Sequence, residues 1–449
     1  MYSLRLGLES LRQHARRNMI AGAAIAVGLL ATLSIIGFAE RTNAYLAAIA
    51  MYVEKPGHVA IIKKDGLRRR LVEPKKYSLS SKEWNDLNRY LEKDPAVDFA
   101  APYLFGFGLV GNGCKSQPFI VTGFDITKQK AVTEYPELKR IIPEFRSLTR
   151  GEALWSSSQK SPITLSGGLA KRLNKSAELP AKAFTEVIDL KECDSNELKA
   201  KLASDRNVQM LTQDFDNRLN AVDGEFVGEF STGVEITEKS AMQMPLALLQ
   251  DLLRTDKISY LGVFLKDRRQ AHAYAKSIVR SMADRGVFID AYTWDAELWN
   301  QNYFAGAAVL VVTELFVGVV VAIVVFLSIM NTLTIGLAEA RREIGMLRAV
   351  GYNPTQISYI FTVEAFAMGI IAVIVGSILS MGLFHVISKL EIPMHFAGFS
   401  QDSTFQILPP FWSYFAASAF LLLLVAGTSM VLSRRYASQP ILDLLNRGG

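Results

Sequence analysis

Residues 315–338 read LFVGVVVAIVVFLSIMNTLTIGLA, a run of 24 residues without a charged side chain. A helix rises about 1.5 Å per residue, so ~20 apolar residues are enough to cross the ~30 Å hydrocarbon core of a bilayer. The run exceeds what a buried helix of a soluble protein needs. It therefore predicts a transmembrane helix and makes the chain a membrane protein.

Three more apolar runs occur elsewhere in the chain. Residues 19–39 and 411–432 carry no charge, and residues 361–387 carry only Glu364. One run is N-terminal and three crowd the C-terminal third, which predicts four spans in a 1 + 3 arrangement. A cleaved signal peptide is the alternative for 19–39, with Arg16 and Arg17 as its basic flank. We expect an uncleaved anchor, because the run is long for a signal peptide and no clear cleavage site follows it.

The orientation follows from Lys and Arg in the short segments beside the spans, since these residues favour the cytoplasmic side. The link 388–410 carries only Lys389. The two tails and the link after the second span carry ten basic residues: Arg5, Arg12, Arg16, Arg17, Arg341, Arg342, Arg348, Arg434, Arg435 and Arg447. Both termini are therefore expected in the cytoplasm and the long middle region outside.

The middle region, about 41–300, has the composition of a water-soluble domain, although the whole chain is 50% hydrophobic and only 20% charged. Short alternating runs predict strands at 57–62, 107–110, 119–121, 260–265 and 287–289. Amphipathic spacing predicts helices at 81–93, 244–253 and 269–285. This is an α+β pattern. It loosens over about 128–223, which we interpret as an inserted subdomain.

These boundaries give one expected order of parts along the chain. The parts are a cytoplasmic tail (1–18), span one (19–39), an external α+β domain (40–303, built from 40–127 and 224–300 around the insertion), a stalk end with span two (304–337), a cytoplasmic helix (338–358), span three (359–387), an external loop (388–410), span four (411–433) and a cytoplasmic tail (434–449).

The only two cysteines, Cys114 and Cys193, both fall in the middle region. An external location permits a disulfide between them. Since 79 positions separate them and their geometry is unknown, two unpaired residues are the favoured expectation.

Several function classes find no support. The chain lacks a Gly-x4-Gly-Lys-Ser/Thr phosphate loop and a Gly-x-Ser-x-Gly elbow, and its five histidines form no pair at helical spacing. No catalytic residue, metal site or cofactor is predicted. The net charge is +6, but the basic residues form no long stripe, so nucleic-acid binding is not expected. A secondary transporter is disfavoured because the spans lack buried ion-pathway charges, with Glu314 the nearest exception.

Residues 331–357, NTLTIGLAEARREIGMLRAVGYNPTQI, join spans two and three. Gly351 is placed to stop a short amphipathic helix, and Asn353-Pro354 to start the next. The short helix carries Met346 and Leu347 among charges, which suits docking into a groove on another protein. A merely solvated loop is the alternative. The candidate docking residues are Glu339, Arg341, Arg342, Glu343, Ile344, Gly345, Met346, Leu347, Arg348 and Gly351.

This segment resembles the signature of the FtsX/MacB superfamily of ABC transporter permeases (type VII), in which Glu-Ala-x-x-Arg-Glu-Ile-Gly-x-Leu-Arg-Ala-x-Gly follows span two. Residues 339–351 here read EARREIGMLRAVG. The resemblance implies a coupling helix that receives motion from a separate ABC ATPase dimer, which binds ATP and Mg. It also implies a permease dimer, with a second copy or a paralogue, in the bacterial inner membrane with a periplasmic domain.

Within that superfamily, four short segments resemble the lipoprotein-releasing LolC/LolE branch: 56–59 (PGHV), 121–125 (VTGFD), 168–173 (GLAKRL) and 228–233 (GEFSTG). Their order implies release of a lipoprotein or another amphiphile, with a periplasmic carrier or adaptor as a further partner. The proline that usually follows the aspartate of the second segment is missing, and no carrier-recruiting loop is identifiable. The alternative is a mechanotransmission regulator that relays the ATPase state to a cell-wall hydrolase or a sensor.

Small residues recur at four-residue spacing inside two of the predicted spans. The first span has Gly28 between Ala24 and Thr32, and the third has Ala372, Gly376 and Ser380. Such faces let helix backbones approach closely in lipid. We expect these positions to pack helices together. Four spans are few for a complete pathway, which is a second reason to expect a dimer.

Overall fold

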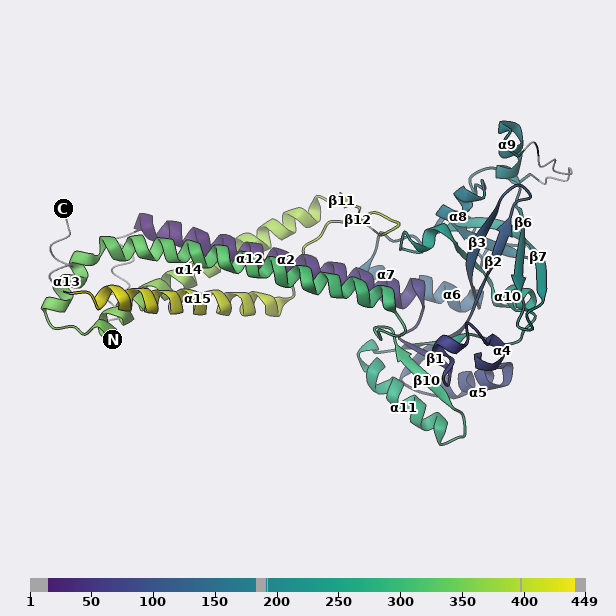
Figure 1. Ribbon diagram of the computed structural model, residues 1–449, viewed down its shortest axis with the longest axis horizontal. Helices are drawn as coiled ribbons and strands as arrows, with labels where there is room; N and C mark the ends of the chain where they lie inside the picture. Colours follow the sequence, from purple (N-terminus) through teal and green to yellow (C-terminus); the bar gives the residue numbers. More distant parts are fainter. Residues whose placement is uncertain (1–14, 183–190, 192, 396–397, 441–449) are drawn as a thin grey trace. The chain divides into compact units, whose positions relative to one another are not determined.

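The computed structural model describes residues 15–182, 191, 193–395 and 398–440 (Figure 1). These residues divide into two compact units. Unit 1 comprises Met1–Asn43, Ala307–Ile392 and Thr404–Gly449, and unit 2 comprises Ala44–Gly306 and Pro393–Ser403.

Unit 1 is helical. Its long helices are α2 (Ala15–Ile49), α12 (Gln301–Glu339), α14 (Pro354–Lys389) and α15 (Phe411–Ala437), with the short α13 (Arg341–Ala349) between the second and third. Within the described residues, these four long helices are long and apolar enough to cross a membrane. One is N-terminal and three are C-terminal, so the predicted 1 + 3 arrangement is confirmed.

The core of unit 1 forms where the four long helices meet. Fully buried Leu29 of α2 lies in one cluster with Val325 of α12, Ala372 of α14 and Val425 of α15. Small residues let the backbones approach. A Cβ atom on Gly376 would lie 3.0 Å from the Cα atom of Ala26, which is closer than ordinary van der Waals contact. Spans one and three therefore pack at the small residues of their facing surfaces.

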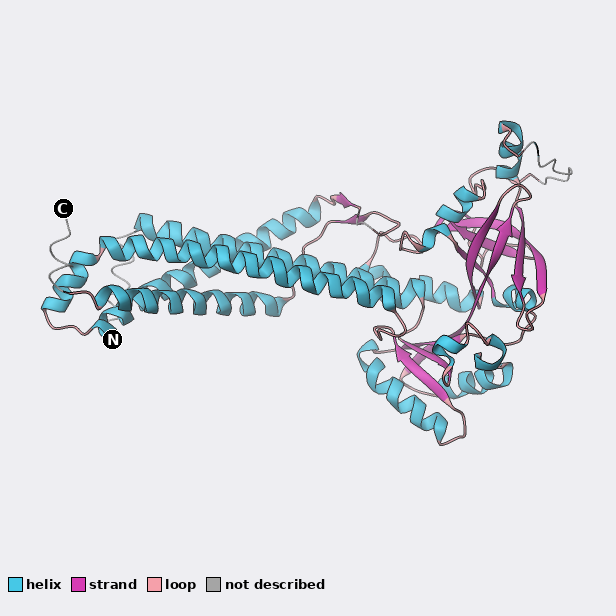
Figure 2. Cartoon of the chain, viewed as in Figure 1, coloured by secondary structure: helices cyan, strands magenta, loops and turns pink. Residues whose placement is uncertain are grey.

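Unit 2 is α+β, as expected from the sequence (Figure 2). Ten strands form one sheet: β1 (Val59–Lys63), β2 (Val97–Gly111), β3 (Ser116–Phe124), β4 (Leu148–Gly151), β5 (Pro162–Ser166), β6 (Asn207–Gln213), β7 (Leu219–Phe230), β8 (Ala241–Pro245), β9 (Tyr260–Leu265) and β10 (Ile289–Thr293).

Six of these strands close into a barrel. The pairing runs β2–β3–β8–β5–β7–β6, and β6 pairs in turn with β2. β2 is 15 residues long. Its first half pairs with β9, which is followed outward by β1 and β10, so β2 belongs both to the barrel and to a flat extension of the sheet. Strands from 128–223 thus share one sheet with strands on either side of that segment.

Helices connect the strands in the described part of unit 2. They are α3 (Gly66–Arg69), α4 (Pro74–Tyr77), α5 (Ser81–Leu91), α6 (Ile126–Thr133), α7 (Pro136–Ile141), α8 (Gly167–Arg172), α9 (Asn196–Ser204), α10 (Leu246–Leu253) and α11 (Ala271–Ala283). The predicted start of α5 is confirmed, because Ser80 and Glu83 form a capping box. In the link after span three, β11 (Pro393–Met394) pairs with β12 (Ser403–Thr404).

Cys114 and Cys193 are joined by a disulfide, with their Cα atoms 5.5 Å apart. The expectation of two unpaired cysteines is wrong. Cys114 lies in the turn between β2 and β3, and Cys193 lies just before α9. The barrel's hairpin is therefore covalently tied to the segment that precedes α9, a proximity that a separation of 79 residues does not reveal.

Candidate functional site

The helix α13 has well-defined ends. α12 stops at Glu339, and Ala340 separates it from α13. At the other end, Gly351 has φ +104°, its N–H group donates to the carbonyl oxygen of Arg348, and the N–H group of Tyr352 donates to that of Leu347, both at 3.1 Å. This is a Schellman motif, in which a left-handed glycine satisfies the last carbonyl groups of the helix. Gly351 therefore stops α13, as expected.

The next helix starts three residues later. Asn353 caps α14 with Gln356 in a reciprocal capping box, and Pro354 occupies the first turn. The amide oxygen of Gln356 accepts from the N–H group of Asn353 at 2.9 Å. The predicted Asn-Pro start of the helix is confirmed. Because both ends of the turn 350–353 are capped, its backbone is fixed by local bonds.

One face of α13 is buried in unit 1. Ile344 is fully buried and Gly345 is buried beside it. Ile344 packs against the cytoplasm-facing ends expected for α14 and α15, in a cluster that contains Leu337, Ala340, Ile344, Ile357, Leu432 and Ala437. Burial of a large aliphatic side chain contributes about 1.5–3 kcal/mol, so this face anchors the helix.

Two further contacts hold the same end together. The guanidinium of Arg341 lies 5.4 Å from the ring centroid of Tyr436, a cation–π contact. The hydroxyl groups of Ser358 on α14 and Ser433 on α15 are 2.9 Å apart and buried. Tyr436, Ser358 and Ser433 are not among the residues that the sequence predicts for this site. Tyr436 and Ser433 lie far from α13 along the chain, and Ser358 belongs to the next helix, so no local pattern pairs these residues with α13.

The opposite face of α13 is exposed, together with Glu339 just before the helix and Val350 just after it. We call it the coupling face; it consists of Glu339, Arg342, Glu343, Met346 and Val350, with Met346 53% and Val350 79% exposed. It presents two apolar side chains among three charges on a helix whose other side is anchored. Such a surface can bind a complementary groove on another protein while α13 stays folded and anchored.

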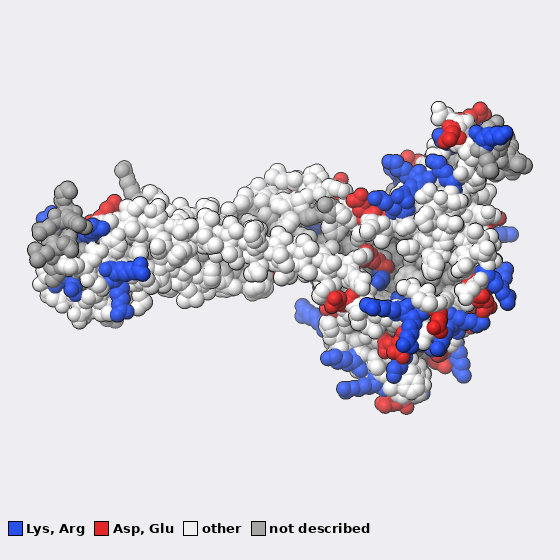
Figure 3. Space-filling model, in the orientation of Figure 1, with Lys and Arg blue, Asp and Glu red and all other residues white. Residues whose placement is uncertain are grey.

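The candidate docking residues therefore divide into three groups. Glu339, Arg342, Glu343 and Met346 lie on the coupling face, and exposed Gly351 follows it. Arg341, Leu347 and Arg348 are half-buried, and Ile344 and Gly345 are buried. Leu347, expected beside Met346 as an exposed apolar side chain, instead packs against the buried cluster. In Figure 3, Lys and Arg side chains are visible at the end of unit 1 that carries α13.

Unit 2 holds the four short segments that resemble one branch of the superfamily. In the first, His58 is 1% exposed. Its Nδ1 atom accepts from the N–H group of Leu265 at 3.0 Å, so its Nε2–H group donates to the hydroxyl of Tyr52 at 3.0 Å. Tyr52 donates onward to Glu137 at 2.8 Å, and Arg268 binds the other carboxylate oxygen at 2.9 Å. Desolvation by burial lowers the pKa of His58 to about 4, so the ring is neutral.

The third and fourth segments meet at a cavity of about 710 Å³. Gly168 and Lys171 line it from α8, Glu229 and Ser231 line it from the end of β7, and Ser400 lines it from the loop after span three. Its buried charges are satisfied: Glu229 accepts from the N–H group of Ala177 and pairs with Arg150. Within the described residues, no group of three His, Cys, Asp or Glu side chains could hold a metal.

Comparison with known proteins gives a family match within the helical unit 1. Residues 315–441 match the family model described as FtsX-like permease C-terminal. The ABC transporter permease YtrF of Bacillus subtilis (strain 168) is 27% identical over 178 residues, which is 38% of this chain and 39% of that protein. This chain thus spans about two fifths of that relative's length.

A second relative aligns over most of the chain. The lipoprotein-releasing system transmembrane protein LolC of Neisseria meningitidis serogroup B is 22% identical over 391 residues, 84% of this chain and 81% of that protein. Among solved structures, the periplasmic region of MacB from Actinobacillus actinomycetemcomitans aligns with 53% of this chain and 89% of its own, at 13% identity and a TM-score of 0.31.

The four spans, the anchored α13 and the matches in sequence indicate the class of protein. Residues 315–441 are those of an FtsX-like permease, and the chain is related in sequence to YtrF, LolC and MacB. It is a non-catalytic membrane subunit.

Proposed function

We propose that this permease receives the motion of a separate ATP-hydrolysing subunit through the coupling face and passes it to unit 2. The observation that carries the proposal is the two-sided structure of α13, with Ile344 buried at its base and Met346 exposed on the opposite side. A helix anchored in this way transmits a push to the spans that hold it. The ATPase binds ATP and Mg, and this chain supplies no cofactor of its own.

The orientation proposed from the sequence supports this function. Ten basic residues against one favour a cytoplasmic position for both termini and for α13. Unit 2 then lies in the periplasm of a bacterial inner membrane, where its disulfide is stable because that compartment is oxidising. The ATPase and the working domain are thus on opposite sides, and the spans connect them.

For the cargo, we propose a lipoprotein or another amphiphile extracted from the membrane. The alignment with LolC, whose name describes lipoprotein release, supports this class because it covers both the spans and unit 2. A second permease copy or a paralogue and a periplasmic carrier or adaptor complete the proposed assembly. If no cargo is released and only a periplasmic enzyme or sensor responds to ATP, the relay function replaces transport.

The test of coupling is charge reversal on the coupling face, with Glu343→Lys and Arg342→Glu made singly and together in the full chain. The matched control is Glu391→Lys, an exposed residue just beyond the other end of α14. We expect the α13 variants to lose co-purification of the ATPase and stimulation of its hydrolysis, and the control to keep both. Unchanged association and unchanged stimulated hydrolysis in the double variant would exclude the coupling role.

The test of cargo is mass spectrometry of material that co-purifies with the detergent-extracted complex. Lipoproteins enriched in the ATP-free complex and lost on ATP addition support release. Enrichment of a cell-wall hydrolase or a sensor, with no lipidated species, favours the relay function.

A further inference from the structure

A second cavity of unit 2, with a volume of about 480 Å³, lies between α7 and the turn that follows β9. Four basic side chains line it: Arg140 comes from α7, and Lys266, Arg268 and Arg269 come from the turn. A guanidinium group presents its N–H donors as a planar fork that matches the oxygens of an anion. Three such groups around one cavity favour an anionic ligand.

Of the three carboxylates that line the same cavity, Glu137 is the least exposed, and both of its oxygens are engaged. One oxygen accepts from Nε of Arg268 at 2.9 Å and from Arg140 at 3.2 Å. The other accepts from the hydroxyl of Tyr52 at 2.8 Å. Because one carboxylate is shared by two guanidinium groups, this cluster keeps one positive charge in excess.

The other two carboxylates do not neutralise the remaining cations. Asp267 accepts from the backbone N–H group of Arg269 at 3.0 Å and so caps the short helix η4 (Arg268–Gln270), and Asp98 is exposed. Lys266 donates to the carbonyl oxygen of Pro95 at 2.8 Å. Within the described residues, neither Lys266 nor Arg269 forms an ion pair. Four basic and three acidic side chains give the cavity a net charge of +1.

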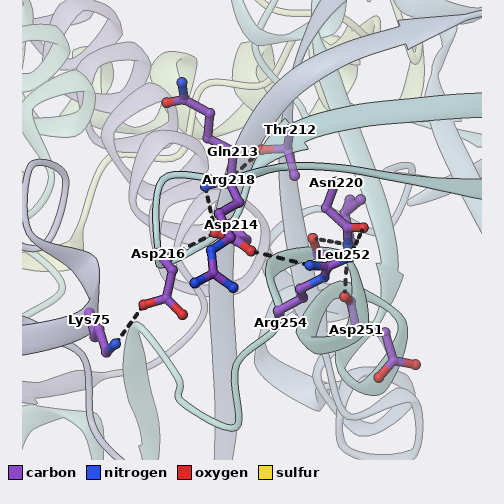
Figure 4. Close-up of polar contacts among 10 residues, drawn as sticks. All are labelled: Lys75, Thr212, Gln213, Asp214, Asp216, Arg218, Asn220, Asp251, Leu252 and Arg254. Carbon is purple, nitrogen blue, oxygen red and sulfur yellow. Dashed lines mark hydrogen bonds and ion pairs between the residues drawn. The ribbon is translucent and has the colours of Figure 1, made fainter.

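The turn after β6 shows the contrasting case, a charged cluster that is satisfied within the chain. Asp214 accepts from the N–H groups of Asp216 and Arg218, both at 2.9 Å (Figure 4). Asp216 in turn accepts from Lys75 at 2.5 Å. These carboxylates have their donors in the chain itself, so the cluster needs no ligand. The cavity beside α7 differs, because two of its cations are paired with no described carboxylate.

We infer that this cavity binds a phosphate group, either as free phosphate or as the phosphodiester of a phospholipid headgroup. We call it the arginine pocket. A phosphodiester carries one negative charge, which the net charge of the pocket balances. Its tetrahedral oxygens can accept from opposite sides at once, from Arg140 on α7 and from Arg269 on η4. The volume exceeds what a phosphate alone fills, so an ester substituent can enter beside Tyr135 and Pro136.

The arginine pocket is connected to the end of α2 through Glu137. Its partner Tyr52 is 1% exposed and lies in η1 (Ala50–Glu54), a π-helical turn that continues α2. Nη1 of Arg268 also lies 3.8 Å from the sulfur of Met51 in the same turn. A ligand that draws Arg140 or Arg268 toward itself weakens their bonds to Glu137 and so changes the bond from Tyr52. Binding therefore acts on the residues that join α2 to the sheet of unit 2.

This inference goes beyond the proposed ATPase coupling and does not depend on it. The test is calorimetric titration of the full chain in dodecyl maltoside, a detergent without phosphate. The two probes are inorganic phosphate and the soluble short-chain lipid dihexanoyl-phosphatidylglycerol. The pocket variant combines Arg140→Gln with Arg269→Gln, and the matched control combines Arg68→Gln with Arg280→Gln. All four arginines are exposed, so both variants should fold, and tryptophan fluorescence verifies that they do.

We expect one saturable site per chain for at least one probe. The pocket variant should bind about tenfold more weakly or worse, because it loses charge-assisted hydrogen bonds from two guanidinium groups, and the control should bind as the original chain does. Saturation by inorganic phosphate identifies the free ion as a ligand, and saturation by the lipid alone identifies the headgroup.

Three results would overturn the inference. They are the lack of saturable binding of either probe, equal affinity in the pocket variant and the control, and the same heat from sodium chloride at equal ionic strength. The ATPase takes no part in these titrations, so this inference and the proposed coupling fail separately.

Discussion

The side-chain amide of Gln401 forms two hydrogen bonds with the backbone of Arg146. Its oxygen accepts from the N–H group of Arg146 at 3.1 Å, and its nitrogen donates to the carbonyl oxygen at 2.6 Å. Gln401 belongs to the loop between the third and fourth long helices, and Arg146 lies just before β4. The amide therefore bonds to both backbone groups of Arg146, as a neighbouring strand would. These bonds hold the loop in unit 2.

The same loop makes further contacts that secure it. The ring of Phe399 lies edge-on to Tyr45 at 4.7 Å, and Ser400 contacts the hydroxyl of Ser231 at 2.6 Å. The N–H group of Ser400 also donates to Gly233. Besides the end of α2 and the start of α12, this loop is therefore a third segment that connects unit 2 to the rest of the chain.

Gln401→Ala should release this loop from β4. Both hydrogen bonds are lost, and each is worth about 1 kcal/mol net. We expect faster hydrogen exchange at the amide of Arg146 and a slightly lower urea midpoint for unit 2, followed by tryptophan fluorescence in detergent. Gln270→Ala is the control, because this exposed glutamine makes no such pair of bonds. An Arg146 amide that exchanges at the original rate would show that the contact is dispensable.

The Cys114–Cys193 disulfide should contribute measurably to the stability of unit 2. It closes a loop with a sequence separation of 79 residues, and such a cross-link typically contributes about 2–4 kcal/mol by restricting the unfolded chain. We expect Cys114→Ser with Cys193→Ser to lower the thermal midpoint of unit 2. Reductant should lower the midpoint of the original chain to that of the double variant and leave the variant unchanged. A reductant effect of equal size in both proteins would assign the loss to something other than this bond.

How much of this fold could be predicted depends on whether the signal is local. The four spans follow from uninterrupted apolar runs such as 315–338, and the ends of α13 follow from Gly351 and Asn353-Pro354. The barrel closes through the pairing of Leu109 with Leu211, about a hundred residues away, and no local pattern announces such a partner. The disulfide was missed for the same reason.

In the candidate site, too, only features with a local signal could be predicted. Helical spacing places Met346 and Ile344 on different faces, but it does not say which face meets the rest of unit 1. Leu347 was expected outside with Met346, and it is drawn inward because Leu337 and Leu432 provide an apolar surface for it. Tyr436, which stacks on Arg341, comes from the end of another helix.

His58 should make unit 2 less stable as the pH falls from about 6.5 toward 4. Its pKa in the folded chain is about 4, lowered chiefly by desolvation, against a usual value of 6.5. Between these values the unfolded chain binds a proton that the folded chain does not, so stability rises with pH and falls on acidification. The full difference is on the order of 3 kcal/mol. The groups that face His58 are Tyr52, Tyr135, Phe264 and Leu265, with Glu137 and Arg268 beyond Tyr52.

The measurement compares urea unfolding at pH 7 and pH 5 for the original chain and for His58→Gln. The glutamine variant should be less stable at pH 7, since it fits the bonds to Tyr52 and Leu265 less well. It should nevertheless lose less stability on acidification, because it has no ring to protonate in the unfolded chain. Identical pH dependence in the two proteins would contradict a neutral buried His58.

The contact between α2 and α14 should be sensitive to side-chain size at Gly376 and not at Gly382, although both glycines lie in α14. A Cβ atom at Gly376 would lie 3.0 Å from the Cα atom and 3.1 Å from the carbonyl oxygen of Ala26, both backbone atoms that cannot rotate away. A Cβ atom at Gly382 would meet nothing within 4 Å. Gly376→Leu must therefore push α2 and α14 apart, and overpacking of this kind costs about 1–3 kcal/mol. Gly382→Leu adds the same side chain to the same helix without that conflict. We expect a lower thermal midpoint of the helical signal in detergent for Gly376→Leu alone, and equal midpoints in the two variants would show that α2 and α14 are not held together at this point.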